Sequence, residues 1–532
     1  MGEVFARKSS GLVRNISAWE TLIFNVLVMA PSAVYIYGIW ATVTFPGVYL
    51  PTTALICIPI CLVIAIFYSL YSAAAPRSGG DYIWISRTVH PGLGFMTNFF
   101  LFIVLISLVG TEIPWTLEYA IAPLLVKMGN PTGAAAILNP ITMMVLGTVY
   151  IVLVSLIAAL GSKWNARVLT IAFFVIVAGI VTFTAVFASI TPAQYAANFD
   201  ASSIPGDMTY AGTIAAGNDV ANTYGLPLMT VFPLAATMLG VTFTMINFLG
   251  FAQSVYIAGE IKDVRRSQFI AILGAVIVFG LLTFMIYQSA YNGMGGAFVN
   301  AISTTYVYES PYYWTNMPVD AITGPWFTVL AIFATDNLGA YFIIVLGFMM
   351  MTWAAGLTYV YTCTRLMFSW SFDRILPTKV SAVDTRFATP WVALIICGVV
   401  AFIFMVLWIF TTIMAFFVYI ITGWFVGNCI ASIAGFIYPT KMKEAFELAP
   451  DIVRKKIGPF YTIQWAAIGS FIVSAWMAYA GMTPTISGAV SVANLAFTFV
   501  FWVIAWIIFG IAWIYHRNRI PLSLTFKEIP PE

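Results

Sequence analysis

The sequence predicts an all-α membrane protein with twelve transmembrane helices. Hydrophobic residues make up 61% of the 532 residues and charged residues only 8%, which is too little charge to cover a water-soluble surface. Crossing about 30 Å of hydrocarbon takes roughly 20 apolar residues, and uncharged runs of that length recur along the chain. The twelve helices are expected over residues 20–44, 51–75, 92–124, 138–160, 167–190, 228–259, 268–292, 338–368, 389–409, 411–437, 462–482 and 491–515.

The distribution of basic residues supports this number of helices. If the N-terminus is cytoplasmic, twelve crossings return the C-terminus to the same side, and all of the 23 Lys and Arg residues except Lys127 then fall at cytoplasmic ends. The predicted outer loops at residues 191–227 and 293–337 contain no basic residue, as the positive-inside rule requires. We therefore expect a multi-pass protein of the cell (plasma) membrane with both termini in the cytoplasm.

The apolar runs also divide the chain into successive parts. The first run is not expected to be a cleaved signal peptide, because it is longer than a signal core and no small-residue cleavage site follows closely. The parts are a cytoplasmic tail at 1–18, helices 1 to 5 at 19–190, an extracellular loop at 191–227, helices 6 to 10 at 228–437, a cytoplasmic loop at 438–461, helices 11 and 12 at 462–515, and a cytoplasmic tail at 516–532.

The first predicted helix contains the stretch NVLVMAPSAVYIYGIW, Asn25 to Trp40, with a proline close to the middle of the membrane. A proline inside a helix removes one backbone hydrogen bond and costs roughly 3 kcal/mol. Small residues flank Pro31, and a simple kink is the plainer interpretation. Interrupted helices at this depth are tolerated where the freed backbone groups are buried in protein or face a wet cavity.

A second interruption lies near the middle of the sixth predicted helix, where residues 247–251 read NFLGF. Two broken helices, five apart, are typical of transporters built from inverted repeats. A repeat of five helices crosses the membrane an odd number of times, so helix 6 begins on the side opposite to helix 1. The sequence therefore favours a transporter with a binding site at the two breaks.

Backbone groups at the breaks are the expected binding groups. A half-helix N-terminus presents unpaired N–H groups and a positive dipole end, and freed carbonyl groups can hold a cation, so a substrate carboxylate can be bound without an arginine. Gly250 is included because a close backbone approach requires that Cβ be absent. The expected substrate-binding residues are Ala30, Pro31, Ser32, Ala33, Asn247, Phe248, Gly250 and Tyr359.

Glu112 is an acidic residue well inside a predicted span. Its plainer interpretation is a carboxylate at the outer interface, near Trp115 and Tyr119. The alternative is a functional group, because ionisable residues in a membrane are costly and usually functional. Three further acids lie near cytoplasmic ends, where ion-paired gate and surface roles both stay open: Asp81 near Arg77, Glu260 near Lys262 and Asp373 beside Arg374.

Other functional classes find little support in the sequence. The sequence shows no nucleotide-binding loop, which a primary pump would need. It also shows no pore loop or ring of charges, which a channel would need. The only histidines, His90 and His516, lie at predicted cytoplasmic ends, so no intramembrane catalytic constellation and no enzyme is expected. Cys57 and Cys61 lie one helical turn apart without histidine or carboxylate nearby, so no metal site is expected.

Three stretches of the sequence carry recognisable motifs. They are APRSGGDY at residues 75–82, FLGFAQSVYIAGEIKDVRR at residues 248–266, and Arg365 followed by DRILP at residues 373–377. They resemble the P-x-x-G-G-x-Y loop, the F-x-G-F…A-x-E-x-K-N-P-x-R run and the R-x7-D-G-x-L-P signature of the amino acid-polyamine-organocation (APC) superfamily. The resemblance covers nearly the whole chain. It implies the leucine-transporter-type fold, a five-plus-five inverted repeat with discontinuous helices 1 and 6 and two additional C-terminal helices, and amino acid transport by alternating access.

Two regions depart from the patterns of this superfamily. Many proton-coupled members have an acid directly after the G-F of helix 6, whereas this chain has Ala252 followed by Gln253. Some members carry a helix 5 lysine in place of a sodium ion, and residues 169–175 contain none. Sodium coupling, proton coupling and uncoupled exchange therefore all stay open. The candidate ion-binding residues are Met29, Thr358 and Thr362, and the candidate coupling residue is Glu112.

We expect a secondary transporter of neutral amino acids. A pocket without a midplane Arg, Lys or Asp would strand a charged side chain at a cost of several kcal/mol. The alternatives are a transporter of cationic amino acids or polyamines that uses Glu112, and a non-transporting receptor of the same fold. The expected partners are the amino acid and the lipid bilayer, with no nucleic acid and no cofactor besides Na⁺ or H⁺ as a coupling ion, and the protein is expected to be a monomer or homodimer.

Overall fold

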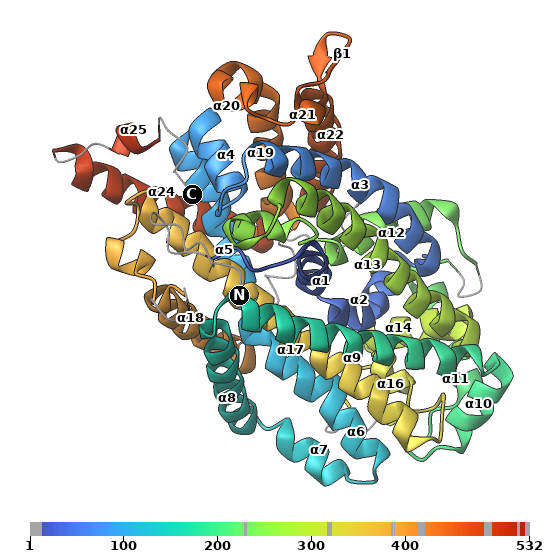
Figure 1. Ribbon diagram of the computed structural model, residues 1–532. Helices are drawn as coiled ribbons and strands as arrows, with labels where there is room; N and C mark the ends of the chain where they lie inside the picture. Colours follow the sequence, from blue (N-terminus) through green and yellow to red (C-terminus); the bar gives the residue numbers. More distant parts are fainter. Residues whose placement is uncertain are drawn as a thin grey trace.

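The computed structural model describes residues 13–227, 231–316, 322–384, 387, 389–411, 421–483, 492–518 and 522–526. Regular structure in these residues is almost entirely helical (Figure 1). The first half contains α1 (Ala18–Val28), α2 (Pro31–Thr44), α3 (Leu50–Ala74), α4 (Asp81–Thr88), α5 (Pro91–Thr116), the π-helix η1 (Leu117–Ile121), α6 (Ala122–Lys127), α7 (Pro131–Ile137), α8 (Pro140–Ala159), α9 (Ser162–Ala188), α10 (Pro192–Ala201), α11 (Tyr210–Tyr224), α12 (Leu234–Asn247) and the 3-10 helix η2 (Gln253–Glu260).

The second half continues in the same way, with one short β-hairpin. It contains α13 (Val264–Met294), α14 (Gly296–Val307), α15 (Pro311–Asn316), α16 (Phe327–Leu330), α17 (Leu338–Phe372), η3 (Thr378–Ser381), α18 (Trp391–Phe410), α19 (Ile421–Lys441), α20 (Lys443–Glu447), α21 (Asp451–Arg454), β1 (Lys456–Ile457), β2 (Phe460–Tyr461), α22 (Thr462–Met482), α24 (Val492–Arg517) and α25 (Leu522–Thr525). The two strands pair antiparallel, with Lys456 opposite Tyr461.

Ten segments of the described chain are long and apolar enough to cross a membrane. They coincide with predicted helices 1 to 5, 7 to 9, 11 and 12, so the multi-pass membrane class is confirmed. In place of predicted helix 6 stands α12, which has only 14 residues before the chain leaves the α-helical conformation. Predicted helix 10 corresponds to α19, and its first part, residues 412–420, lies outside the described residues. The total of twelve stays a prediction.

Both predicted outer loops contain short helices. Residues 191–227 include α10 and α11, and residues 293–337 include α14, α15 and α16. Local signals explain the start of α10, because Thr191 and Gln194 form a capping box and Pro192 occupies the first helical position. Figure 1 places α10 and α11 at one end of the bundle, and α20, α21 and the hairpin at the opposite end.

The helix α1 lies in the centre of the bundle, where it packs against α9, α13 and α17 (Figure 1). It begins with a capping box, in which the Ser17 side chain accepts the Glu20 N–H and the Glu20 carboxylate accepts the Ser17 N–H at 2.8 Å. The chain just before it is extended and pairs with the segment after η2: the Ile16 N–H donates to the Glu260 carbonyl at 3.0 Å, and the Lys262 N–H donates to the Ile16 carbonyl at 2.8 Å. This pairing ties the first span to the segment that follows α12.

Candidate functional site

The proline in the first predicted span begins a new helix. The helix α1 ends at Val28, Ala30 adopts a left-handed conformation (φ 49°, ψ 76°), and Pro31 is the first residue of α2. A proline at the first helical position sacrifices no hydrogen bond, because the N–H of that residue has no acceptor within the helix in any case. The cost of a helix-interior proline is therefore avoided, and the first N–H groups of α2 lie in the middle of the protein.

The second break follows the end of α12 at Asn247. Residues 248–252 form turns, and Gly250 has a positive φ of 105°, which L-residues with a side chain rarely adopt. A Cβ on Gly250 would lie 2.6 Å from Cγ1 of Val28 and 3.3 Å from its carbonyl carbon. The two breaks therefore meet at Gly250 and Val28, and the missing side chain allows this approach.

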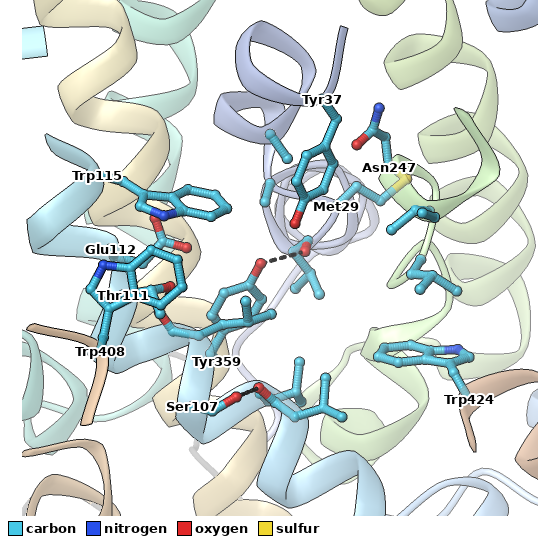
Figure 2. Close-up of a pocket in the computed structure, with 18 residues that line it drawn as sticks. Met29, Tyr37, Ser107, Thr111, Glu112, Trp115, Asn247, Tyr359, Trp408 and Trp424 are labelled. Carbon is cyan, nitrogen blue, oxygen red and sulfur yellow. Dashed lines mark hydrogen bonds between the residues drawn. The ribbon is translucent and has the colours of Figure 1, made fainter. Parts of the chain in front are cut away.

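A cavity lined by 18 residues adjoins the two breaks (Figure 2). Its volume, taken as the space open to the centre of a water-sized sphere, is about 80 Å³. One water molecule needs roughly 10–15 Å³ on this measure, so the cavity has room for a small organic molecule. The lining residues come from α1, α2, α5, α12, α17, α18, α19 and the two breaks.

The cavity brings together part of the predicted site. The predicted residues that line it are Met29, Ala30, Ala33, Asn247, Tyr359 and Glu112. The predicted residues that do not line it are Pro31, Ser32, Phe248, Gly250, Thr358 and Thr362. The last two were candidate ion ligands. Their hydroxyl groups donate to carbonyl groups of their own helix, Thr358 to Ala355 at 2.7 Å and Thr362 to Thr358 at 2.9 Å.

Several polar groups at the breaks lack partners in the described chain. The Ser32 hydroxyl at the start of α2 is fully buried and makes no hydrogen bond. The Asn247 amide makes one weak contact, from Nδ2 to the Tyr287 hydroxyl at 3.4 Å, while its Oδ1 has no partner. The Tyr359 hydroxyl donates to the Val28 carbonyl at 3.2 Å, as Figure 2 shows. Asn247 and Tyr359 line the cavity, and Ser32 lies next to the lining residue Ala33 in the chain.

Glu112 lies in the wall of this cavity. The residue is 1% exposed, its Oε2 atom has no hydrogen-bond partner, and no described basic residue forms a salt bridge with it. The side chain is therefore buried inside the protein, whereas its depth in the membrane, and with it the expectation of a carboxylate at the outer interface, stays a prediction. A buried ionised carboxylate without a partner is costly, so Glu112 is expected to meet a proton or a cation in function.

Aromatic side chains that the sequence analysis did not select form much of the wall. Trp115 and Trp408 lie beside Glu112, whereas Tyr37 and Trp424 lie elsewhere around the cavity (Figure 2). Tyr37 stands four residues after Ala33, so helical spacing from the break could have identified it. The tryptophans of α18 and α19 carry no such signal, because an apolar helix shows in its sequence neither which face meets lipid nor which faces the cavity.

Two buried ion pairs connect α17 with distant segments. Arg365 Nε lies 2.8 Å from Glu260 Oε1, and Arg87 Nη1 lies 2.6 Å from Asp373 Oδ2; all four side chains are at most 2% exposed. The Tyr361 hydroxyl also donates to Glu260, at 2.5 Å. The acids therefore pair with residues far away in the sequence and not with their neighbours.

The third acid of this group, Asp81, is held by neutral donors. Its Oδ1 accepts hydrogen bonds from the Tyr256 hydroxyl at 2.8 Å and the Asn98 amide at 3.1 Å, and its Oδ2 accepts one from the Tyr68 hydroxyl at 3.1 Å. Burial raises the pKa of Asp81, and these hydrogen bonds oppose the rise. Asp81 forms no salt bridge with any described residue.

Comparisons with known proteins agree with this architecture. Residues 22–515 match the model of a protein family described as amino acid permease. No curated protein matches the chain. The family match spans both breaks, all of the cavity wall and both ion pairs.

Proposed function

Because the chain belongs to the amino acid permease family of the APC superfamily, we propose that it is a secondary active transporter that carries amino acids across the cell membrane by alternating access. One observation supports this most directly: a small cavity beside two meeting helix breaks, with buried polar groups that have no partners among the residues that the structure describes. Broken helices supply charge-complementary backbone groups for a zwitterion at membrane depth.

The breaks offer complementary groups for the head group of an amino acid. We place the α-carboxylate at the start of α2, next to the lining residues Ala30 and Ala33, where the Ser32 hydroxyl offers a donor and the helix dipole is positive. The α-ammonium group lies near the Val28 carbonyl and Asn247 Oδ1, which both belong to lining residues. The Val28 carbonyl accepts the Tyr359 hydroxyl, and a carbonyl oxygen has a second lone pair.

The side-chain subsite suits a neutral amino acid. Glu112 is the single charged residue among the 18 that line the cavity, and most of the others are aromatic or aliphatic, with Ser107, Thr111 and Asn247 as neutral polar exceptions. A neutral substrate leaves Glu112 without a counter-charge, so Glu112 carries a proton in this complex. That proton makes Glu112 the proposed coupling group, in place of the acid that many relatives have after the G-F motif.

A second candidate substrate class is favoured by the position of Glu112. A cationic amino acid or polyamine would place its ammonium group against the Glu112 carboxylate. Trp115 and Trp408 flank that carboxylate, and aromatic faces attract ammonium groups. In this case Glu112 stays ionised and acts as a substrate ligand.

The buried ion pairs support a proposal for how access to the cavity alternates between the two sides of the membrane. In the predicted orientation Glu260, Arg365 and Asp373 lie on the cytoplasmic side, where two buried ion pairs join α4 and η2 to α17 and its C-terminal end. We propose that these pairs close the cytoplasmic side of the cavity and separate when the inverted repeats rock against each other. Breaking a buried pair is costly, so substrate binding must favour the rearranged state.

Uptake into proteoliposomes tests the proposal and separates the two substrate classes. Neutral and cationic amino acids are offered with imposed Na⁺ or H⁺ gradients, to the parent protein and to Glu112→Gln. The matched control is Glu118→Gln, on the same span but outside the cavity wall. If the substrate is neutral, Glu112→Gln keeps exchange but loses the response to a proton gradient; if it is cationic, the variant loses affinity at least about tenfold. Binding without any uptake would identify a receptor and contradict the proposal.

A further inference from the structure

A second and smaller cavity lies next to the central one. Its lining includes Asp81, Asn98, Tyr256 and Asn428, from α4, α5, η2 and α19. Its volume on the same measure is about 20 Å³, which is room for one or two species the size of water. Trp424 lines both cavities, so its side chain forms part of the wall between them.

The carboxylate in this cavity has no counter-charge among the described residues. Asp81 is only 5% exposed, and the described side chains that contact its oxygens are the neutral Tyr68, Asn98 and Tyr256. Removing a carboxylate from water is unfavourable unless it is paired with a cation or takes up a proton. Hydrogen bonds from neutral groups reduce this cost but leave the net charge in place.

The cavity also holds more oxygen acceptors than protons to satisfy them. Asn98 Nδ2 donates to Asp81 Oδ1 at 3.1 Å and to the Gly94 carbonyl at 3.2 Å, which fixes the amide orientation. Asn98 Oδ1 is consequently a buried acceptor without a partner in the described chain. The single proton of the Tyr68 hydroxyl faces both Asp81 Oδ2 at 3.1 Å and Asn428 Oδ1 at 2.8 Å, and it can serve only one of them.

We propose that this cavity binds a small monovalent cation of the size of Na⁺. The Asp81 carboxylate supplies the compensating charge, and the amide oxygens of Asn98 and Asn428 supply further ligands. Carboxylate and amide oxygens are the ligands that hard cations take in proteins. The site is separate from the predicted ion ligands Thr358 and Thr362, whose hydroxyl groups bond to their own helix.

A cation at this position would link distant parts of the fold. Asp81 belongs to α4, Asn98 to α5 and Asn428 to α19, and Tyr256 brings in the segment after the helix 6 break. Trp424 carries the effect to the substrate cavity, because it lines both spaces. This coupling role, unlike cation binding itself, rests on the proposed function in transport.

Equilibrium binding of ²²Na⁺ to the purified full-length protein in detergent tests the site, without any amino acid present. We expect saturable binding that unlabelled NaCl displaces and choline chloride at equal ionic strength does not. Asp81→Asn should reduce binding to background, and Asn98→Ala should weaken it by about tenfold or more. The matched control is Glu118→Gln, a half-buried carboxylate that lines neither cavity, which should bind as the parent does.

Three results would overturn the inference: no saturable binding by the parent, unchanged binding by Asp81→Asn, or an equal loss of binding in the control Glu118→Gln. Gel filtration and circular dichroism verify that each variant is folded. If Asp81→Asn does not fold, the parent and Asn98→Ala decide the matter. Amino acid uptake is measured separately. Uptake without Na⁺ binding would refute this cation site alone, whereas Na⁺ binding without uptake would refute only the proposed function.

Discussion

At the scale of single residues, Gly250 allows the two helix breaks to meet. Its φ of 105° disfavours a side chain, and the Cβ of an alanine at this position would lie only 2.6 Å from Val28 Cγ1. We expect Gly250→Ala to destabilise the protein by about 1–3 kcal/mol and to abolish substrate binding, because the backbone of the break must move. Thermal unfolding and equilibrium binding measure the two effects.

A matched control for this substitution is Gly225→Ala. Gly225 also has a positive φ, 65°, but a Cβ there would meet nothing within 4 Å. An alanine at this position adopts the left-handed α conformation (φ 65°, ψ 32°) without a steric conflict and should retain full binding. Equal loss of binding in both variants would show that backbone conformation alone, and not contact between the breaks, explains the effect.

Ser32 gives a second test at the same scale. Its buried hydroxyl has no partner in the described chain, so Ser32→Ala removes an unsatisfied group and should leave the melting temperature unchanged or higher. Substrate affinity should fall by about tenfold, since a hydrogen bond to a charged carboxylate contributes roughly 1.5–3 kcal/mol. Ser69→Ala, another buried and unpartnered serine away from the cavity wall, should change neither quantity. Unchanged affinity in Ser32→Ala would argue against carboxylate binding at α2.

At the scale of elements, the buried pairs hold α4 and η2 against α17 and its C-terminal end. Glu260→Gln removes the carboxylate charge that faces the buried Arg365 guanidinium, so we expect a loss of about 3–5 kcal/mol in stability, visible in thermal unfolding. The control is Asp451→Asn in the Arg454–Asp451 pair, where the Asp451 side chain is 96% exposed. No measurable change is expected there, because surface pairs contribute little. Similar melting temperatures for both variants would mean that the buried pair does not hold these elements together.

The elements also show why the sequence located the two helix breaks but not the partners of the buried acids. Proline and the small residues around it mark the start of α2, and Asn247 and Gly250 mark the end of α12, because backbone geometry depends on local residue types. The partners of Glu260 and Asp373 lie 105 and 286 residues away along the chain. The basic residues that neighbour these acids in the sequence therefore indicated that charges gather at the predicted cytoplasmic ends of the helices. They did not indicate which ion pairs form.

At the scale of the whole molecule, the predicted orientation can be tested by thiol labelling. A cysteine at Asp219 in α11 should react with a membrane-impermeant reagent from outside the cell, and one at Glu444 in α20 only after permeabilisation. The native cysteines are buried or half-buried and are replaced first to remove background. Labelling of both positions from the same side would contradict the predicted number of crossings between them.

The sequence by itself determined the membrane class, the position of both breaks and the family. These features depend on composition, on charge distribution and on local backbone chemistry, all of which are written along the chain. The placement of Glu112 in the cavity wall, the aromatic residues Trp408 and Trp424 and the surroundings of Asp81 emerged only from the tertiary structure. The physical reason is that lipid and protein interior are both apolar, so hydropathy cannot distinguish a lipid-facing side from one that packs against another helix. Only the packing of helices far apart in the sequence decides which side chains meet.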